Sequence, residues 1–134
     1  MPFTEANFEN AILEIFRDLL GYEYLYGPDV VRDFADPLCV EILDEALVRI
    51  NPSLPRAAID EAIARIRNIE SGSLARKNAQ FTDMLQNGVA VNYFDGSEQR
   101  AGLVRLVDYD LPMRNRFTVA NQWTVEERSV RRAD

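Results

Sequence analysis

The spacing of apolar residues changes at Val89, and this change restricts the possible folds more than any other feature of the chain. Before Val89, apolar residues recur every three or four positions, which is the spacing of an amphipathic helix. After Val89, apolar and polar residues alternate, as they do in strands that bury one face. Helices followed by neighbouring strands are typical of α+β domains. We therefore predict an α+β fold in which an N-terminal helical layer packs on a mostly antiparallel sheet.

Residues that begin and end helices divide the first part of the chain into four predicted helices and one short strand. Thr4 can cap the first helix, and Gly21 is well placed to end it. The helices are expected at residues 5–20, 37–50, 55–69 and 73–86. The third helix carries an apolar stripe made of Ala58, Ile59, Ala62, Ile63 and Ile66. Tyrosines at alternating positions predict a packed strand at 22–26, which Gly27 and Pro28 end.

The second part of the chain is predicted to be mainly β-structure. The strands are expected at residues 89–94, 102–110 and 116–125. Between the first two strands, Asp95-Gly96-Ser97 is typical of a hairpin turn. The length of 134 residues is that of one domain. We thus expect a single domain, 1–134, with a mainly helical half at 1–88 and a mainly β half at 89–134.

The composition argues against several classes of function. The chain has no histidine and one cysteine, Cys39, which removes Ser-His and Cys-His nucleophile pairs and a disulfide framework. No apolar run approaches the roughly 20 residues of a membrane helix, and the first residues do not resemble a secretion signal. A cytoplasmic protein with no membrane contact is therefore expected. No Gly-rich phosphate loop follows a predicted strand, so this part of the protein is not expected to bind ATP.

The net charge of −7 bears on nucleic-acid binding. It argues against a general nucleic-acid clamp, because neutralising phosphates usually requires a basic face. It is compatible with a metal-dependent nuclease, since such enzymes gather carboxylates at the reaction centre. In a chain without histidine, a metal would be held by carboxylate oxygens, and Mg²⁺ is the natural candidate.

One carboxylate occupies an unexpected position in the first predicted helix. A helical projection places Glu9 inside the apolar arc, between Leu13 and Phe16, whereas Glu14 falls on the opposite face. A buried carboxylate is costly unless it is paired, protonated or bound to a metal. The alternative is a partly exposed side chain at the edge of the apolar stripe. The projection alone leaves both interpretations open.

Three stretches resemble the N-terminal region of the restriction (motor and nuclease) subunit of type I restriction-modification enzymes. They are FTEANFENAILEIFRDLLGYEY, NAQFTDMLQNGVAVNY and LVDYDLPMRNRFTVANQWTVEERSVRRAD. In that family, an Asn-x-Phe-x-Val strand leads to an Arg-Pro-Asp triplet that opens a hairpin. The return strand of the hairpin carries the Glu-x-Lys half of a PD-(D/E)xK nuclease site. Here the strand is 115–119 and the triplet is Arg132-Ala133-Asp134, with alanine in place of proline.

The resemblance implies an incomplete restriction-endonuclease-like domain. Asp134 would be the metal-binding aspartate, and the polypeptide would end before the Glu and Lys that complete the site. By itself it is therefore expected to be inactive. Members of the nuclease superfamily often place a helix Glu beside the metal, which implies that Glu9 joins Asp134 as a catalytic residue and Mg²⁺ ligand. Arg131 and Arg132 are expected to contact the nucleic acid.

For the parent subunit, the resemblance implies Mg²⁺-dependent, ATP-linked cleavage of foreign unmethylated DNA. The ATP would be bound by parent domains that lie outside this sequence. The expected partners are DNA and the methyltransferase and specificity subunits of the restriction complex. The alternative is a non-catalytic docking module that helps to assemble a multi-subunit DNA-processing complex. A parent reading frame that continues into a Glu-x-Lys strand would favour the nuclease.

Overall fold

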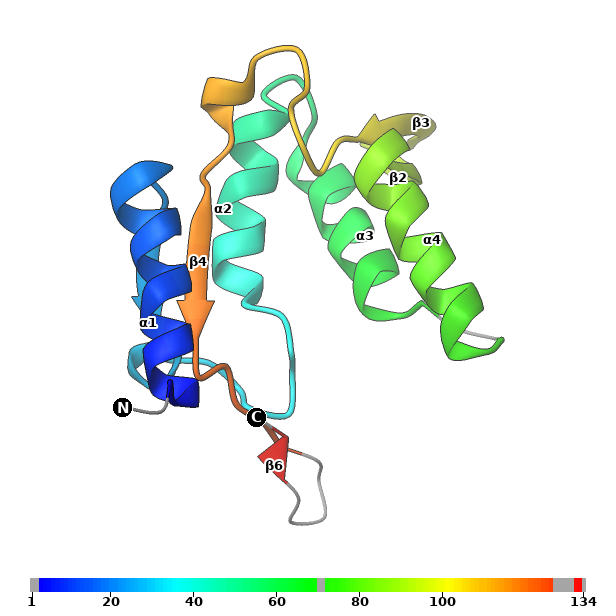
Figure 1. Cartoon of the computed structure of the whole chain (residues 1–134). Coiled ribbons are helices and arrows are strands. Elements are labelled where there is room, and N and C mark those ends of the chain that lie inside the picture. Colours follow the sequence, from blue (N-terminus) through cyan, green and yellow to red (C-terminus); the bar gives the residue numbers. More distant parts are fainter. Residues whose placement is uncertain (1–2, 70–71, 127–131, 134) are drawn as a thin grey trace. The chain divides into compact units, whose positions relative to one another are not determined.

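A computed structural model describes residues 3–69, 72–126 and 132–133 of the chain (Figure 1). The chain divides into two compact units. The terminal unit combines residues 1–39 with 116–134, and the central unit consists of residues 40–115. Within the described residues, the elements confirm an α+β fold with four α-helices.

In the terminal unit, the first helix begins and ends close to the predicted residues. Helix α1 (Glu5–Glu14) is capped by Thr4, whose hydroxyl oxygen accepts a hydrogen bond of 3.2 Å from the Asn7 N–H. A π-helical turn, η1 (Ile15–Leu19), continues the helix. Gly21 then adopts a φ of +71°, which a residue without a Cβ tolerates best. The predicted helix at 5–20 is thus present, with a wider last turn.

The terminal unit contains a parallel strand pair rather than an antiparallel sheet. Strand β1 (Glu23–Tyr26) pairs with β4 (Thr118–Asn121), with Tyr24 opposite Val119. Figure 1 shows α1 beside β4. Parallel strands need a long crossover connection, and here the connection contains the whole central unit. The prediction of one mostly antiparallel sheet is therefore wrong at this pair.

The last predicted strand, 116–125, is interrupted. Gln122 has a φ of +51°, in the left-handed region that side chains other than glycine rarely adopt. This residue separates β4 from β5 (Val125–Glu126), which pairs antiparallel with β6 (Arg132–Ala133). In the described part of the chain, the strands thus form three separate two-stranded sheets instead of one.

The central unit follows the prediction more closely. Its helices are α2 (Val40–Ile50), α3 (Arg56–Arg67) and α4 (Leu74–Asn87), and its hairpin consists of β2 (Val89–Asp95) and β3 (Glu98–Val104). Gly96 forms the predicted turn with a φ of +67°. Strand β3 ends at Val104, before the predicted strand does, and the next N–H, that of Arg105, donates to the Asn51 Oδ1. Farther along, the Asp108 Oδ1 accepts hydrogen bonds from the N–H groups of Asp110 and Leu111 and forms a turn. A 3₁₀ turn, η3 (Pro112–Arg114), follows.

Most buried apolar residues belong to the central unit, where α3 packs on the hairpin. All five residues of the predicted α3 stripe are buried. The remaining buried apolar residues of this unit are Leu47, Ile50, Val89, Val91 and Val104. Asn51 is also buried, and its amide bonds to the backbone oxygens of Leu47 and Arg105 at 2.9 Å each. None of the described helices is both long and apolar enough to cross a membrane.

Candidate functional site

Glu9 lies half-exposed on α1 and has a polar partner. The Gln122 Nε2 donates to the two carboxylate oxygens of Glu9, at 3.1 Å to Oε1 and 3.4 Å to Oε2. The projection therefore identified a carboxylate on the side of α1 that faces the chain just after β4. Glu9 is thus partly exposed, as the second interpretation expects, and its carboxylate accepts hydrogen bonds from an amide.

The partner of Glu9 sits where the parallel strands end. Tyr26 and Asn121 are the last paired residues of β1 and β4, and Gln122 follows directly. The Tyr24 hydroxyl donates a hydrogen bond of 2.8 Å to the Asn121 Oδ1. We call Glu9, Tyr24, Asn121 and Gln122 the strand-end cluster. In open α/β sheets, ligands bind beyond the carboxyl ends of the parallel strands, and Gln122 follows the corresponding end of this two-stranded pair.

The tyrosines of β1 have different roles. Tyr22, just before the strand, lies between Phe16 and Phe117, with ring centroids 5.1 and 5.4 Å away. This contact is the packing that the alternating tyrosines predicted. Tyr24 instead directs its hydroxyl to Asn121. No local pattern indicates this difference, because it depends on a residue of another strand, 97 positions away in the sequence.

Gly27 is a second residue whose role the sequence did not reveal. From the sequence alone, Gly27 indicates only the end of a strand. A Cβ on Gly27 would lie 2.4 Å from the Gln122 carbonyl oxygen and 2.5 Å from that of Asn121. Only glycine therefore lets the chain after β1 approach the chain after β4 this closely. This approach fixes the backbone that carries Gln122.

An ion pair joins β1 to the chain just before β4. The Arg116 guanidinium donates two hydrogen bonds of 2.5 Å to the two carboxylate oxygens of Glu23. The hydrogen bond from Arg116 lowers the pKa of Glu23 below its ordinary value of 4.5, and this effect exceeds the opposing effect of desolvation. Bidentate contacts of this kind fix the direction of both side chains.

This ion pair predicts a dependence of stability on pH. Because the pKa of Glu23 is lowered in the folded state, its stabilisation is complete above about pH 4.5 and is lost as the pH falls through the lowered value. Thermal unfolding of the parent subunit between about pH 3 and pH 6 should show a smaller acid effect in Glu23→Gln. Glu41→Gln, on the exposed side of α2, should behave as the wild type. Equal acid sensitivity in the wild type and Glu23→Gln would contradict the contribution of this pair.

The strand-end cluster offers oxygen ligands of the kind that Mg²⁺ prefers. The Glu9 carboxylate and the Gln122 amide provide such atoms, so their chemistry fits the predicted metal. Within residues 3–69, 72–126 and 132–133, however, no three His, Cys, Asp or Glu side chains come together as a metal site.

The other predicted site residues are Asp134, Arg131 and Arg132. Asp134 and Arg131 do not belong to the residues that the structure describes, and for Arg132 only the backbone of β6 is described. The convergence of Glu9 with Asp134 therefore stays a prediction. The same holds for DNA contacts by the two arginines.

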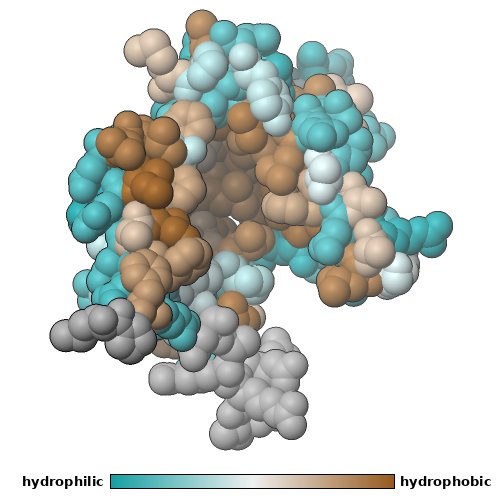
Figure 2. All heavy atoms as spheres, viewed as in Figure 1, coloured by the Kyte–Doolittle hydropathy of each residue, from teal (hydrophilic) through white to brown (hydrophobic). Residues whose placement is uncertain are grey.

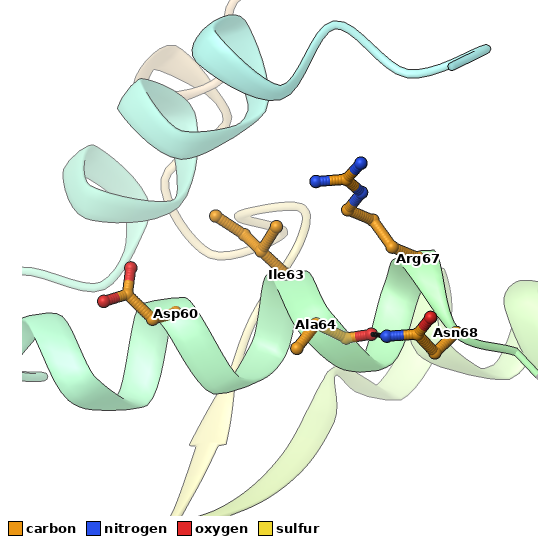
Figure 3. A pocket seen from close by; sticks show the side chains of 5 residues that line it. All are labelled: Asp60, Ile63, Ala64, Arg67 and Asn68. Carbon is orange, nitrogen blue, oxygen red and sulfur yellow. Dashed lines mark hydrogen bonds between the residues drawn. The ribbon is translucent and has the colours of Figure 1, made fainter. Parts of the chain in front are cut away.

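A hollow on α3 does not provide an alternative site. Figure 3 shows the side chains that line it, which are Asp60, Ile63, Ala64, Arg67 and Asn68. The Asn68 amide donates a hydrogen bond of 2.8 Å to the Ala64 carbonyl of the same helix. Asp60 pairs with Arg56 at 2.9 Å. The one carboxylate of this hollow is thus already engaged in a surface ion pair of the helix, and we find no reactive arrangement here.

Comparison with known proteins gives a consistent result. A family model described as type I restriction enzyme R protein N terminus (HSDR_N) matches residues 2–134. The endonuclease subunit of type I restriction enzyme HindI from Haemophilus influenzae is 35% identical over 93% of this chain. A protein of Methanocaldococcus jannaschii, provisionally named as the endonuclease subunit of type I restriction enzyme MjaIXP, is 27% identical over 88% of it. The matched part spans only 12% of each relative. No solved structure matches the chain significantly.

Proposed function

Since the chain belongs to the family of type I restriction enzyme R protein N termini, we propose that it supplies part of a Mg²⁺-dependent DNA cleavage site. The complete site would belong to the endonuclease domain of the parent subunit. The two relatives carry the name of endonuclease subunits, which supports this proposal. In the proposed domain, which is of the PD-(D/E)xK kind, Glu9 and Asp134 hold the metal.

The contact between Glu9 and Gln122 is the observation that carries the proposal. It directs a carboxylate of α1 toward the chain that leaves β4 and continues, through β5 and β6, to Asp134. Two hydrogen bonds from one amide orient the carboxylate, as a metal ligand requires. When bound, Mg²⁺ supplies Lewis-acid stabilisation of phosphate charge and lowers the pKa of a water molecule. The work of the chain itself is to present the carboxylates with the correct spacing and direction.

The remaining parts of the reaction belong to the rest of the complex. We propose that ATP is bound by other domains of the parent subunit and that methyltransferase and specificity subunits recognise the DNA sequence. Arg131 and Arg132 would contact the DNA backbone close to the proposed aspartate. Phosphate contacts of this kind position the nucleic acid and do not read its sequence.

Cleavage by the reconstituted complex tests the proposal. The parent subunit, combined with its methyltransferase and specificity subunits, should cut an unmethylated plasmid when Mg²⁺ and ATP are present. The same plasmid should stay intact after methylation of its recognition sites or after removal of the metal by a chelator. Cleavage that persists without a divalent metal would rule out the proposed chemistry.

A docking module is the second candidate, and exposed apolar residues favour it. Figure 2 shows apolar side chains gathered over α1 and η1. The exposed members are Phe8, Ile15, Leu19 and Leu20. Exposed groups of this size often mark a contact surface. If docking is the whole function, Leu19→Glu should weaken assembly of the complex, and Asp134→Asn should leave cleavage unchanged.

A further inference from the structure

An arginine in the terminal unit lies over two aromatic rings. The Arg32 Cζ lies 3.9 Å from the centroid of the Trp123 ring and 5.2 Å from that of Phe34. The side chain is half-buried, and its Nε has no hydrogen-bond partner in the described part of the chain. A guanidinium accepts such an environment because it is weakly hydrated and stacks well on aromatic faces.

The same guanidinium joins two distant segments. Its Nη1 donates a hydrogen bond of 2.9 Å to the Asp36 carbonyl, and its Nη2 donates to the Thr124 carbonyl. Arg32 therefore contacts the loop that follows β1 and the chain that follows β4 at the same time. A residue at this position can fix the distance between the two segments.

Two more hydrogen bonds join the same segments. The Trp123 Nε1 donates to the Pro37 carbonyl at 2.9 Å, and the Glu126 N–H donates to the Phe34 carbonyl at 2.8 Å. We call residues 32–37 and 123–126, with these contacts, the Arg32 clasp. The clasp holds residues that lie beyond the end of β4, where the β1–β4 pair no longer constrains the backbone.

The clasp lies directly before the segment that carries the proposed aspartate. Thr124 precedes Val125, Val125 pairs with Ala133 in the β5–β6 ladder, and Asp134 follows Ala133 in the sequence. Because the backbone turns at Gln122, the direction of β4 does not determine the direction of β5. We infer that Arg32 is a positioning residue for the cleavage reaction, because it fixes the backbone that leads to Asp134. This inference rests on the proposed function.

The geometry requires arginine and not merely a positive charge. Two donors of one planar group reach two carbonyls while the face of the group covers Trp123. Lysine has a single flexible ammonium and cannot reproduce both contacts together with the stacking. Arg32→Lys and Arg32→Met should therefore have similar effects, although only the second removes the charge.

Binding of Mg²⁺ alone to the full-length subunit tests the inference. Calorimetric titration without ATP or DNA should show a Mg²⁺ site that Asp134→Asn abolishes. In Arg32→Met and Arg32→Lys, the affinity of this site and the rate of DNA cleavage by the complex should fall about 10- to 100-fold. ATP hydrolysis should stay unchanged. Arg17→Met is the matched control, since Arg17 is an exposed residue of η1 in the same unit that pairs with the neighbouring Asp18.

The possible outcomes separate this inference from the proposed function. If Asp134→Asn loses Mg²⁺ binding and cleavage while both Arg32 variants keep them, the positioning role is wrong and the proposed function stands. If Asp134→Asn also cleaves DNA normally, the proposed function itself is wrong. If Arg32→Met does not fold, the same measurements are made on Trp123→Phe. It keeps a ring under the guanidinium but removes the donor to Pro37 and part of the aromatic surface, so a smaller loss of Mg²⁺ affinity than in Arg32→Met is expected.

Discussion

In the full-length subunit, Glu9→Gln should reduce DNA cleavage at least about 100-fold, because losing a group that only supports a metal ligand already costs about 10- to 100-fold. The substitution keeps the size of the side chain and still offers an oxygen to the Gln122 amide, so α1 should keep its place beside β4. It removes the negative charge that the proposed metal site requires. ATP hydrolysis should continue at the rate of the wild type, since the proposed ATP site lies in other domains.

Glu14→Gln provides the control for this experiment. Glu14 is an exposed residue near the end of the same helix, and its projection falls on the face opposite Glu9. It should cleave DNA as the wild type does. Asp134→Asn gives the reference for complete loss. Normal cleavage by Glu9→Gln, with Asp134→Asn inactive, would show that the helix carboxylate takes no part in the site.

The central unit shows what short-range patterns can predict. The stripe of α3 and the turn at Gly96 depend on residues a few positions apart, and both are found as predicted. Such patterns are dependable because the helix repeat and the hairpin turn are set by local backbone geometry. The early end of β3 was not foreseen, since the N–H that follows the strand, that of Arg105, donates to the side chain of Asn51, 54 residues away.

The terminal unit shows where such patterns fail. The pairing of β1 with β4 joins segments separated by the entire central unit, and no local spacing specifies a partner or a direction. The left-handed backbone at Gln122 was also missed, because glutamine rarely adopts it and nothing nearby in the sequence requires it. The strand predicted at 116–125 therefore included residues that belong to a turn.

The candidate site was predictable only in part, for a physical reason. The cost of placing a carboxylate among apolar residues directed attention to Glu9. The structure shows Glu9 half-exposed beside Gln122, and its role as a site residue stays a prediction. Its partner Gln122 is 113 residues away, and the sequence contains no sign of that contact. Arg32 was not identified either. Its proposed role depends on contacts with two aromatic rings and two carbonyl groups, which come together only in the folded chain.

Gly27→Ala should disturb both the stability and the activity of the terminal unit. The added Cβ would meet two backbone carbonyl oxygens at 2.4 and 2.5 Å, and backbone atoms cannot rotate away as a flexible side chain can. Forcing extra volume into a close contact costs about 1–3 kcal/mol. Amide hydrogen exchange in β4 should report a lower free energy of local opening of about that size. DNA cleavage should fall as well, because the oxygens that must move belong to Asn121 and Gln122.

Gly96→Ala separates this effect from the general cost of replacing glycine. A Cβ at Gly96 would meet no atom within 4 Å, so its cost arises only from the φ of +67° in the hairpin of the central unit. It should lower the stability of that hairpin by about 1 kcal/mol and leave cleavage unchanged. A loss of cleavage in Gly27→Ala, but not in Gly96→Ala, would show that the close approach of the segments after β1 and β4 supports the orientation of Glu9. Equal cleavage by both variants would instead show that the site tolerates a shift of Gln122.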